Sequence, residues 1–478
     1  MTANLTQFRI EGLHGRARTI DIPIKDNRLV LVGENGIGKS TVANLLYYTL
    51  TQQWRRVAEY KFAAIQVTVS EETIRLEHPD FEALSERQAV HFRRDFRRHY
   101  SPSLLRQIDP QVMQEVLFFE GEEGEQESAI LRLSDLAKVP RAVARDLFLD
   151  FRGSQAAKLK KGLLQQVKRL AAWQFGQFLY LPTYRRIEQD LKSIFRGIEI
   201  EEKVREFRDR FRKRERTTFI ELIEFGMEDV DKTIQARMAQ IKESVRTGLG
   251  TLTGTYLREV IRGLQDNPDV SVLRSIDPNA FQSMFARIDE AILPASDKKL
   301  LQSKIAEIQT GYTIGPDDKV IAHFLSKLVT LYNEQQANES DVRDFVRLCN
   351  VYLTGKQFIY DDLKYEIYVA QTGSEEQGRD AESRLELKVL SSGEKQIVSL
   401  FSHIYLSGER QFFVVIDEPE LSLSVPWQQR FLPDILATGR CTGVVAVTHS
   451  PFIWDNDLEP YVRSLAEFIE ISNGNLIR

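Results

Sequence analysis

The chain has 478 residues, about three times the ~150 residues of a common domain, so we expect more than one structural unit. Its 64 Lys and Arg against 69 Asp and Glu give a net charge of −5, which argues against a uniformly basic nucleic-acid-binding surface. No long apolar run, no basic and apolar leader and only two cysteines are present, so we expect no membrane helix, no secretory signal and no disulfide framework, hence a cytoplasmic protein.

The first eighty residues are expected to form strands with one early helix. Short apolar segments punctuated by Gly, Asp and Asn are typical of strands, and those that fit are residues 5–10, 19–24 and 28–32. A helix is expected over residues 40–50, and residues 63–69 and 73–76 are expected to pair as a β-hairpin. Residues 1–80 are therefore the predicted N-terminal part of an α/β domain.

Residues 81–345 are mainly helical in pattern, with one core strand expected near residues 178–182. Two apolar stripes with steps of three and four residues indicate amphipathic helices, which favours a helical hairpin or arm over about residues 186–265. The stripes consist of Ile200, Val204, Phe207 and Phe211, and of Val230, Ile234, Met238, Ile241 and Val245. Ordinary helices packed on a domain are the alternative interpretation.

Strand patterns return in residues 346–478. A hairpin is expected from residues 356–360 paired with 365–369. A further strand is expected over residues 384–389, and a helix over residues 394–405. Continuous apolar runs at residues 412–416 and 444–447 are typical of buried parallel strands. The simplest description is an α/β domain split by a large helical insertion.

A phosphate-binding loop is predicted between the third strand and the first helix. The segment matches G-x-x-x-x-G-K-[ST] and continues into Thr41; its residues are Gly33, Glu34, Asn35, Gly36, Ile37, Gly38, Lys39 and Ser40. The glycines allow backbone N–H groups to surround a β-phosphate, and the helix N-terminus adds its positive end. Lys39 is expected to reach the β- and γ-phosphates and the Ser40 hydroxyl to bind Mg²⁺. A purely structural glycine turn is the alternative.

Two carboxylates follow the apolar run at residues 412–416. At the end of such a strand, Asp417 is expected to hold Mg²⁺ and Glu418 to polarise the attacking water. Upstream, the segment 390–394, with sequence Leu-Ser-Ser-Gly-Glu, leads directly into the predicted helix. His449 follows the second apolar run, although a single histidine is more often packed or solvated than functional.

The order of these motifs resembles the ABC-type ATPases, in which a Walker A loop, a signature, a Walker B pair and a switch histidine succeed one another. The resemblance implies ATP and Mg²⁺ as cofactors, Lys39, Glu418 and His449 as catalytic residues, and Ser40 and Asp417 as metal ligands. It also implies that the signature of one subunit completes the ATP site of another. The signature residues are Ser391, Ser392, Gly393 and Glu394. We therefore expect head-to-tail dimers or a larger ring, with slow turnover that depends on oligomerisation.

The family's γ-phosphate-sensing glutamine is not identified by a motif. Its candidates are Gln111, Gln114, Gln174 and Gln177. Asn-Lys-x-Asp, the mark of a guanine-specific site, is missing from the sequence, so adenine is the expected base.

Ser40 and Ser391 are 351 positions apart (391 − 40), and the residues between them are largely helical in pattern. This length resembles the OLD, RecF and SMC branch of the superfamily. The segments 180–186, 390–396 and 417–424 resemble ATPase subunits of bacterial anti-phage systems. The overall size, without a Toprim domain, is most similar to the ATPases of the PARIS systems. That resemblance implies a sensor or scaffold that holds a separate Toprim-type nuclease effector and releases it on detecting a phage-encoded trigger protein. About thirty residues follow the switch histidine here, so we expect the effector on another polypeptide.

Other functions fit the same motifs. A RecF-like, ATP-gated DNA-repair protein would place the arginine clusters at residues 93–98 and 212–216 on phosphates, and its DNA binding would be ATP-dependent and steeply salt-dependent. Such clusters are more often solvated helix faces, and the net charge does not indicate a nucleic-acid partner. A Septu-type ATPase paired with an HNH nuclease is a close variant, and a scaffold that binds ATP without turnover is a third possibility.

Overall fold

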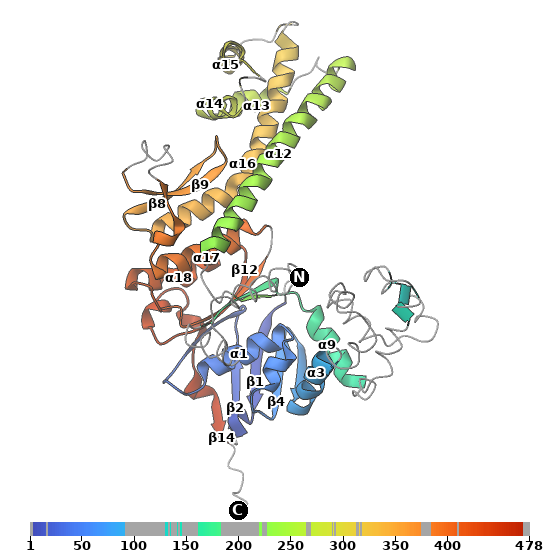
Figure 1. Ribbon diagram of the computed structural model, residues 1–478, viewed down its shortest axis with the longest axis vertical. Coiled ribbons are helices and arrows are strands. Elements are labelled where there is room, and N and C mark those ends of the chain that lie inside the picture. Colours follow the sequence, from blue (N-terminus) through green and yellow to red (C-terminus); the bar gives the residue numbers. More distant parts are fainter. Residues whose placement is uncertain are drawn as a thin grey trace, which may run out of the picture. The chain divides into compact units, whose positions relative to one another are not determined.

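The computed structural model divides the chain into two compact units (Figure 1). Unit 1 comprises Met1–Ile223 and Arg410–Arg478, and unit 2 comprises Glu224–Glu409. The structure describes residues 3–15, 18–90, 161–182, 219–221, 227–263, 269–288, 293–311, 318–373, 384–408 and 411–471, with a few isolated positions between them. A mixed α/β fold with a helical insertion is confirmed. The domain boundaries predicted after residues 80 and 345 stay a prediction.

Unit 1 contains a parallel six-stranded sheet in the order β13-β3-β12-β11-β6-β7. Its strands are β3 (Arg28–Val32), β6 (Gln177–Leu181), β7 (Phe219–Glu221), β11 (Phe412–Asp417), β12 (Cys441–Val447) and β13 (Val462–Ser464). All side chains of β11 are buried, because an uninterrupted apolar strand suits the centre of a sheet that is covered on both faces. The predicted strands here are confirmed, and β7 and β13 were not predicted.

A second, antiparallel sheet in unit 1 has the order β14-β2-β1-β4-β5. Its strands are β1 (Leu5–Glu11), β2 (Arg18–Pro23), β4 (Ala64–Val69), β5 (Glu72–Glu77) and β14 (Ile469–Ile471). The predicted hairpin is β4 paired with β5. Within the described residues, the helices of unit 1 are α1 (Lys39–Leu50), α2 (Trp54–Ala58), α3 (His78–Val90), α9 (Lys161–Ala172) and α18 (Val425–Ala437), with 3₁₀ turns η1 (Leu13–Gly15), η8 (Pro451–Ile453), η9 (Glu459–Tyr461) and η10 (Leu465–Phe468).

Helix α1 joins the two sheets of unit 1 into one core. Its buried side chains belong to a cluster that also contains side chains of β1, β2, β4, β11 and β12. Tyr47 of α1 stacks on Tyr180 of β6 with ring centroids 4.4 Å apart, and the Tyr180 hydroxyl donates to Oδ1 of Asn44. This packing fixes the helix that follows the phosphate-binding loop against the parallel sheet.

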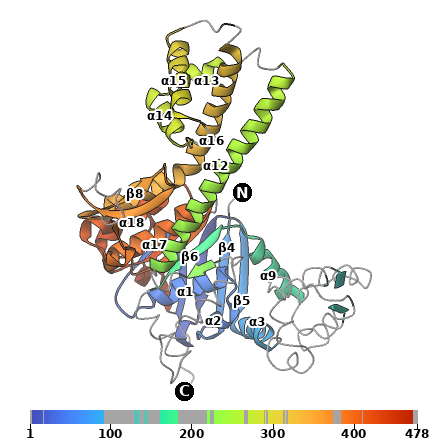
Figure 2. The same ribbon diagram turned by 45° about the horizontal axis from the view of Figure 1, so that its top comes forward.

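Unit 2 is built on two long helices that lie side by side in Figures 1 and 2. They are α12 (Met227–Ile261) and α16 (Lys319–Tyr352). The apolar stripe predicted between residues 230 and 245 is buried on α12, as helical spacing requires. The other stripe and the first half of the hairpin predicted over residues 186–265 lie outside the described residues, so the hairpin stays a prediction.

Shorter elements complete unit 2. They are α13 (Val270–Ser275), α14 (Pro278–Ala286), α15 (Ala295–Gln309), β8 (Lys356–Asp361), β9 (Glu366–Gln371), β10 (Arg384–Leu385), η7 (Leu387–Val389) and α17 (Ser392–Leu406). Helices α13 to α16 share one apolar core. Strands β8 and β9 form the predicted hairpin, in a three-stranded sheet with β10.

The strand predicted over residues 384–389 is wrong in length. Only Arg384 and Leu385 pair with β9, and the chain then turns into η7. Val389 is exposed and Leu390 is buried, because the chain turns there into the start of α17. Alternating side chains alone cannot distinguish a long strand from a short strand followed by a turn.

A buried ionic cluster ties the β8–β9 turn to the helices of unit 2. Arg287, just after α14, donates from Nη1 to Oε1 of Glu339 at 2.7 Å and from Nη2 to Oδ2 of Asp362 at 2.6 Å. Glu339 lies on α16 and is fully buried, and it also accepts from Arg343 at 2.8 Å. A carboxylate this deeply buried depends on such partners to remain charged.

No helix within the described ranges is both long and apolar enough to span a bilayer.

We expect Arg287→Met to destabilise unit 2 by about 3–5 kcal/mol, because it leaves the Glu339 carboxylate buried without its bidentate partner. Arg347→Met is the matched control: Arg347 is largely exposed and forms a surface ion pair with Asp344, so its loss should cost no more than ~1 kcal/mol. Urea unfolding followed by circular dichroism measures both. Equal unfolding midpoints for the two variants would contradict the assigned role of Arg287.

Candidate nucleotide-binding site

Three neighbouring parallel strands of unit 1 carry the predicted motifs at one edge of the sheet. Strand β12 lies between β3 and β11, and all three run in the same direction. The phosphate-binding loop follows β3, Asp417 ends β11, and His449 comes two residues after β12. Because the carboxyl ends of parallel strands share an edge, motifs separated by hundreds of residues meet there.

The loop from Gly33 to Ser40 wraps around the amino group of its own lysine. Nζ of Lys39 donates to the carbonyl oxygens of Gly33 at 2.8 Å and Glu34 at 2.9 Å. Gly38 precedes α1 with φ +112°, a left-handed conformation that glycine adopts without strain. It offers no side chain to cap the first N–H groups of α1, so these remain available to an anion.

Burial lowers the pKa of Lys39, while the carboxylates of Asp417, Glu418 and Glu420 act in the opposite direction without cancelling it. Lys39 is 4% exposed. A lysine with a desolvated ammonium group gains strongly from a nearby anion, since the anion restores the stabilisation that water supplied. The site is therefore arranged to favour a polyphosphate next to Lys39.

Ser40 and Asp417 are brought together from opposite parts of the sequence. The Ser40 hydroxyl donates to Oδ1 of Asp417 at 2.8 Å, and Asp417 is 5% exposed. A hydroxyl and a carboxylate are hard oxygen donors of the kind that Mg²⁺ takes together with nucleotide phosphates. The residues present therefore fit Mg²⁺.

Glu418, the residue directly after β11, has a left-handed backbone conformation. Its φ is +53°, which is uncommon for a residue with a Cβ, and its N–H donates to the carbonyl of Val447 at 2.8 Å. Strained backbone of this kind persists where the surrounding structure holds it, often at functional sites. This conformation ends the alternation of the strand at Glu418, whose carboxylate acts electrostatically on Lys39.

Glu420 was not singled out from the sequence. It accepts from the Thr448 hydroxyl at 2.7 Å and from the His449 N–H at 2.8 Å, and so joins the segment after β11 to the segment after β12. The Glu-Pro-Glu pattern around it marks an acidic turn but gives no sign of its partner. Glu420 thereby fixes the backbone of His449, whose side chain is exposed and whose role stays a prediction.

Arg18 is a second residue that the sequence pattern does not reveal. From β2 in the other sheet, its Nη2 donates to the carbonyl of Ile37 at 3.2 Å. This contact braces the middle of the phosphate-binding loop. Other strands of the same sheet also carry arginines, such as Arg9 and Arg75, so only the fold identifies the one that reaches the loop.

The signature residues are held at the start of α17 in unit 2. Ser391 is the N-cap: its Oγ accepts from the N–H of Glu394 at 3.4 Å, and its N–H donates to Oε2 of Glu394 at 2.6 Å. This reciprocal arrangement is a capping box. Ser392 and Gly393 form the first turn of the helix, so the predicted transition from signature to helix is confirmed in its local structure.

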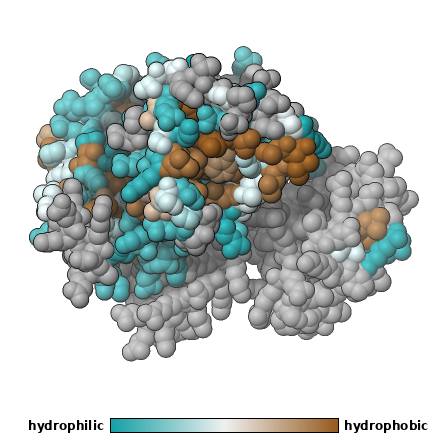
Figure 3. Space-filling view, turned by 90° about the horizontal axis from the view of Figure 1, so that it is seen from above, coloured by the Kyte–Doolittle hydropathy of each residue, from teal (hydrophilic) through white to brown (hydrophobic). Residues whose placement is uncertain are grey.

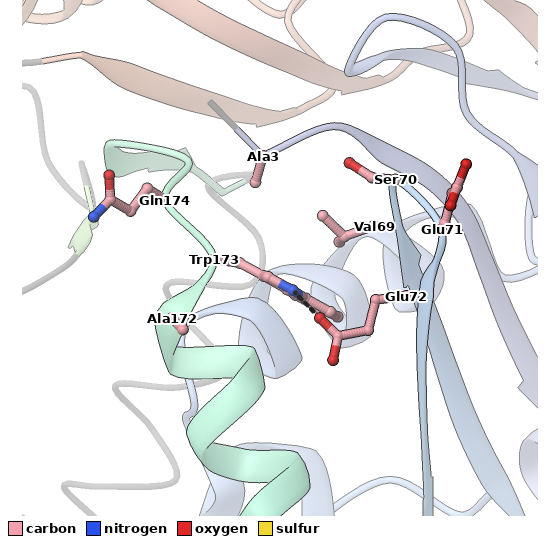
Figure 4. Close-up of a pocket in the computed structure, with 8 residues that line it drawn as sticks. All are labelled: Ala3, Val69, Ser70, Glu71, Glu72, Ala172, Trp173 and Gln174. Atoms are coloured by element: carbon pink, nitrogen blue, oxygen red, sulfur yellow. Dashed lines mark hydrogen bonds between the residues drawn. The ribbon is translucent and has the colours of Figure 1, made fainter. Parts of the chain in front are cut away.

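Two of the candidates for the γ-phosphate-sensing glutamine lie away from the sheet edge that carries the phosphate-binding loop. Gln177 begins β6 and pairs in register with Phe412, the first residue of β11, so it lies at the amino ends of the strands. Gln174 precedes it and lines a surface pocket of about 590 Å³ with Trp173 and Glu72 (Figure 4). That pocket belongs to the β4–β5 turn and the end of α9. Gln111 and Gln114 lie outside the described residues.

Comparison with known proteins places the chain in a family. A family model described as AAA ATPase domain matches residues 5–454, and the protein belongs to this ATPase family. No curated protein sequence matches it significantly. Among solved structures it is similar to the Smc head domain with an extended coiled coil bound to the C-terminal domain of ScpA from Pyrococcus furiosus (11% identity, 95% of this chain and 92% of that chain, TM-score 0.33). It is also similar to the Smc head domain with a coiled coil and joint from Pyrococcus yayanosii (15%, 95% and 94%, TM-score 0.30).

The family confirms the expected class, a P-loop ATPase. We expect Lys39→Ala to reduce affinity for ATP by at least about 100-fold, because it removes the buried ammonium group from the phosphate position. Lys25→Ala is the control, since Lys25 is an exposed lysine of the same unit. Titration with a fluorescent ATP analogue measures both. Unchanged affinity in Lys39→Ala would refute the assignment of the phosphate-binding loop.

Proposed function

We propose that this ATPase is the sensor or scaffold subunit of an anti-phage defence complex, and that it binds and hydrolyses ATP with Mg²⁺ at the edge formed by β3, β12 and β11. The observation that carries the catalytic part is the 2.8 Å hydrogen bond between Ser40 and Asp417. It brings the two oxygen donors of the predicted metal site together next to Lys39.

In this proposal each side chain has a separate task. Lys39 and the N-terminus of α1 bind the phosphates, and Ser40 and Asp417 hold Mg²⁺, which neutralises charge on the phosphates when bound. Glu418 orients and polarises the attacking water. Glu420 holds the backbone of His449, so that the imidazole is presented at the same edge. Catalysis of this type is mostly positioning and electrostatic stabilisation.

We further propose that the ATP site is completed by the signature of a second copy, in a head-to-tail dimer or a larger ring. Large apolar side chains are exposed beside both sets of motifs. Leu421 and Phe452 follow the Walker B pair and the histidine in unit 1, and Val389 precedes the signature in unit 2. A second chain that covers them supplies a reason for their exposure. The capping box supports the same proposal, because it holds the N-terminus of α17 in one conformation.

The defence role rests on the resemblance of the segments 180–186, 390–396 and 417–424 to ATPase subunits of anti-phage systems, and on an overall size most similar to AriA, the ATPase of the PARIS system. One departure is Ser424, where many relatives have histidine; here it precedes α18 as the N-cap. In this proposal a separate Toprim-type nuclease is held inactive and released when a phage-encoded trigger protein is sensed.

The helical arm of unit 2 is the proposed docking surface for these partners. Apolar residues gather on the end of the arm that faces the viewer in Figure 3. Those near the end of α12 and the start of α16 include Leu257, Val320 and Ile261, the last of which is 84% exposed. Several large apolar side chains exposed close together are typical of a protein-binding surface.

We expect Glu418→Gln to retain ATP binding and to lower turnover by at least about 100-fold, since a positioned general base contributes that much. The trapped nucleotide should also shift the protein to its assembled state. Glu459→Gln is the matched control, because Glu459 is exposed in η9 of the same unit. Phosphate release and size-exclusion chromatography measure both effects. Turnover at the parental rate would exclude the role given to Glu418.

Native mass spectrometry of Glu418→Gln protein, purified with ATP from cells that carry the neighbouring genes, tests the defence role. A complex with a nuclease is the expected result, and a Toprim or an HNH nuclease would distinguish a PARIS-type from a Septu-type system. An ATP-dependent assembly without a second protein would contradict the sensor role and favour a RecF-like DNA clamp. Gapped DNA, titrated at several salt concentrations, would then be the next ligand.

A further inference from the structure

Lys356, the first residue of β8, makes a contact that the sequence motifs do not include. Its Nζ donates to Oε2 of Glu394 at 2.7 Å and lies 3.5 Å from the carbonyl oxygen of Val389. Both partners flank Ser391, the N-cap of the signature helix. Lys356 thus spans the signature turn from one side to the other.

The same oxygen of Glu394 serves two donors. Oε2 accepts from the backbone N–H of Ser391 at 2.6 Å as well as from Lys356, and the Glu394 side chain is only 6% exposed. Burial raises the pKa of Glu394, but the hydrogen bonds from Lys356 and Ser391 outweigh it, so the pKa is lowered and the group remains a carboxylate. Without the ammonium group, a buried anion would remain on the signature turn.

Lys356 is itself held on a fixed element. Two residues further along β8, the backbone N–H of Phe358 donates to Oδ1 of Asn350 at 2.6 Å, and Nδ2 of Asn350 donates back to the Phe358 carbonyl at 2.9 Å. Asn350 lies in the last turn of α16. The lysine is therefore placed by the strand and by α16, with a side chain that reaches across to α17.

We propose that Lys356 is a positioning residue of the signature. It neutralises Glu394 and holds the turn at Ser391, so that the Ser391 hydroxyl and the N-terminus of α17 are aimed at the γ-phosphate bound by a second copy of the chain. The inference rests on the proposed function, in which the signature acts on the nucleotide of another subunit. Lys356 acts through Glu394 and Ser391 and does not touch the nucleotide itself.

We expect Lys356→Met to lower turnover by about 10- to 100-fold, because a displaced signature loses the orientation that catalysis requires. The affinity of the chain's own phosphate-binding loop for ATP should not change. Lys356→Arg should restore most of the turnover, since it returns the charge. Lys364→Met is the control: Lys364 lies on the β8–β9 turn and is exposed. Parental turnover in Lys356→Met would overturn the inference.

A second pair of measurements separates positioning from simple loss of structure. Glu394→Gln in the Lys356→Met background removes the unpaired buried anion while an amide oxygen remains to accept from Ser391, so the double variant should be more active than Lys356→Met. A double variant that is no more active than the single one would show that Lys356 does not work through the Glu394 charge.

Mixing Lys356→Met with Lys39→Ala chains tests the action between subunits. The first supplies an intact phosphate-binding loop and the second an intact signature, so the mixture should exceed the summed activity of its components severalfold. No gain would overturn the inference, provided that size-exclusion chromatography under assay conditions with ATP shows the wild-type protein and the mixed variants as dimers or larger assemblies that exchange chains. If the wild-type protein turns over ATP as a monomer, the two-subunit site of the proposed function fails instead.

Discussion

The hydrogen bond between Ser40 and Asp417 joins positions 377 residues apart and brings the two parts of the predicted site together. It is possible only because β3 and β11 are parallel and separated by the single strand β12. With this order, the loop after β3 and the carboxylates after β11 meet at one edge. The segment after β12 comes between them and is tied to β11 through Glu420. The order of the strands in the sheet therefore determines which residues meet at the predicted site.

The charges at this edge are balanced within the fold. Asp417 is buried at the end of an apolar strand, and Lys39 is buried at the start of α1. Each would be costly alone, because the protein interior disfavours an isolated ion. Their proximity reduces that cost, but burial still lowers the pKa of Lys39. A polyphosphate with Mg²⁺ supplies opposite charge to both, so the site is most stable when its proposed ligands are bound.

The sequence predicts those features that are local along the chain. The phosphate-binding loop, the helix that follows the segment 390–394 and the buried runs of β11 and β12 follow from short patterns that carry their own physical reasons. The capping box at Ser391 was found only in the structure. The roles of Glu420 and Arg18 depend on contacts between segments far apart in the sequence, and no periodicity reveals them. Strand order places Gln177 at the opposite edge. The strand expected through residue 389 ends early because its partner β9 pairs with only two residues.

The buried ionic contacts of unit 2 are better explained by geometry than by stability. Apolar residues of similar volume often stabilise a fold as much as a buried ion pair, because the cost of desolvation offsets the attraction. A hydrogen-bonded ion pair, unlike apolar packing, is directional and therefore fixes which atoms come into contact. Arg287 contacts Asp362 at the turn of the β8–β9 hairpin, and Lys356 contacts Glu394 at its base. The hairpin is thus attached at one end to α16 and the residue that follows α14, and at the other end to α17. Within unit 2, the start of α17 is therefore coupled through this hairpin to the long helix α16.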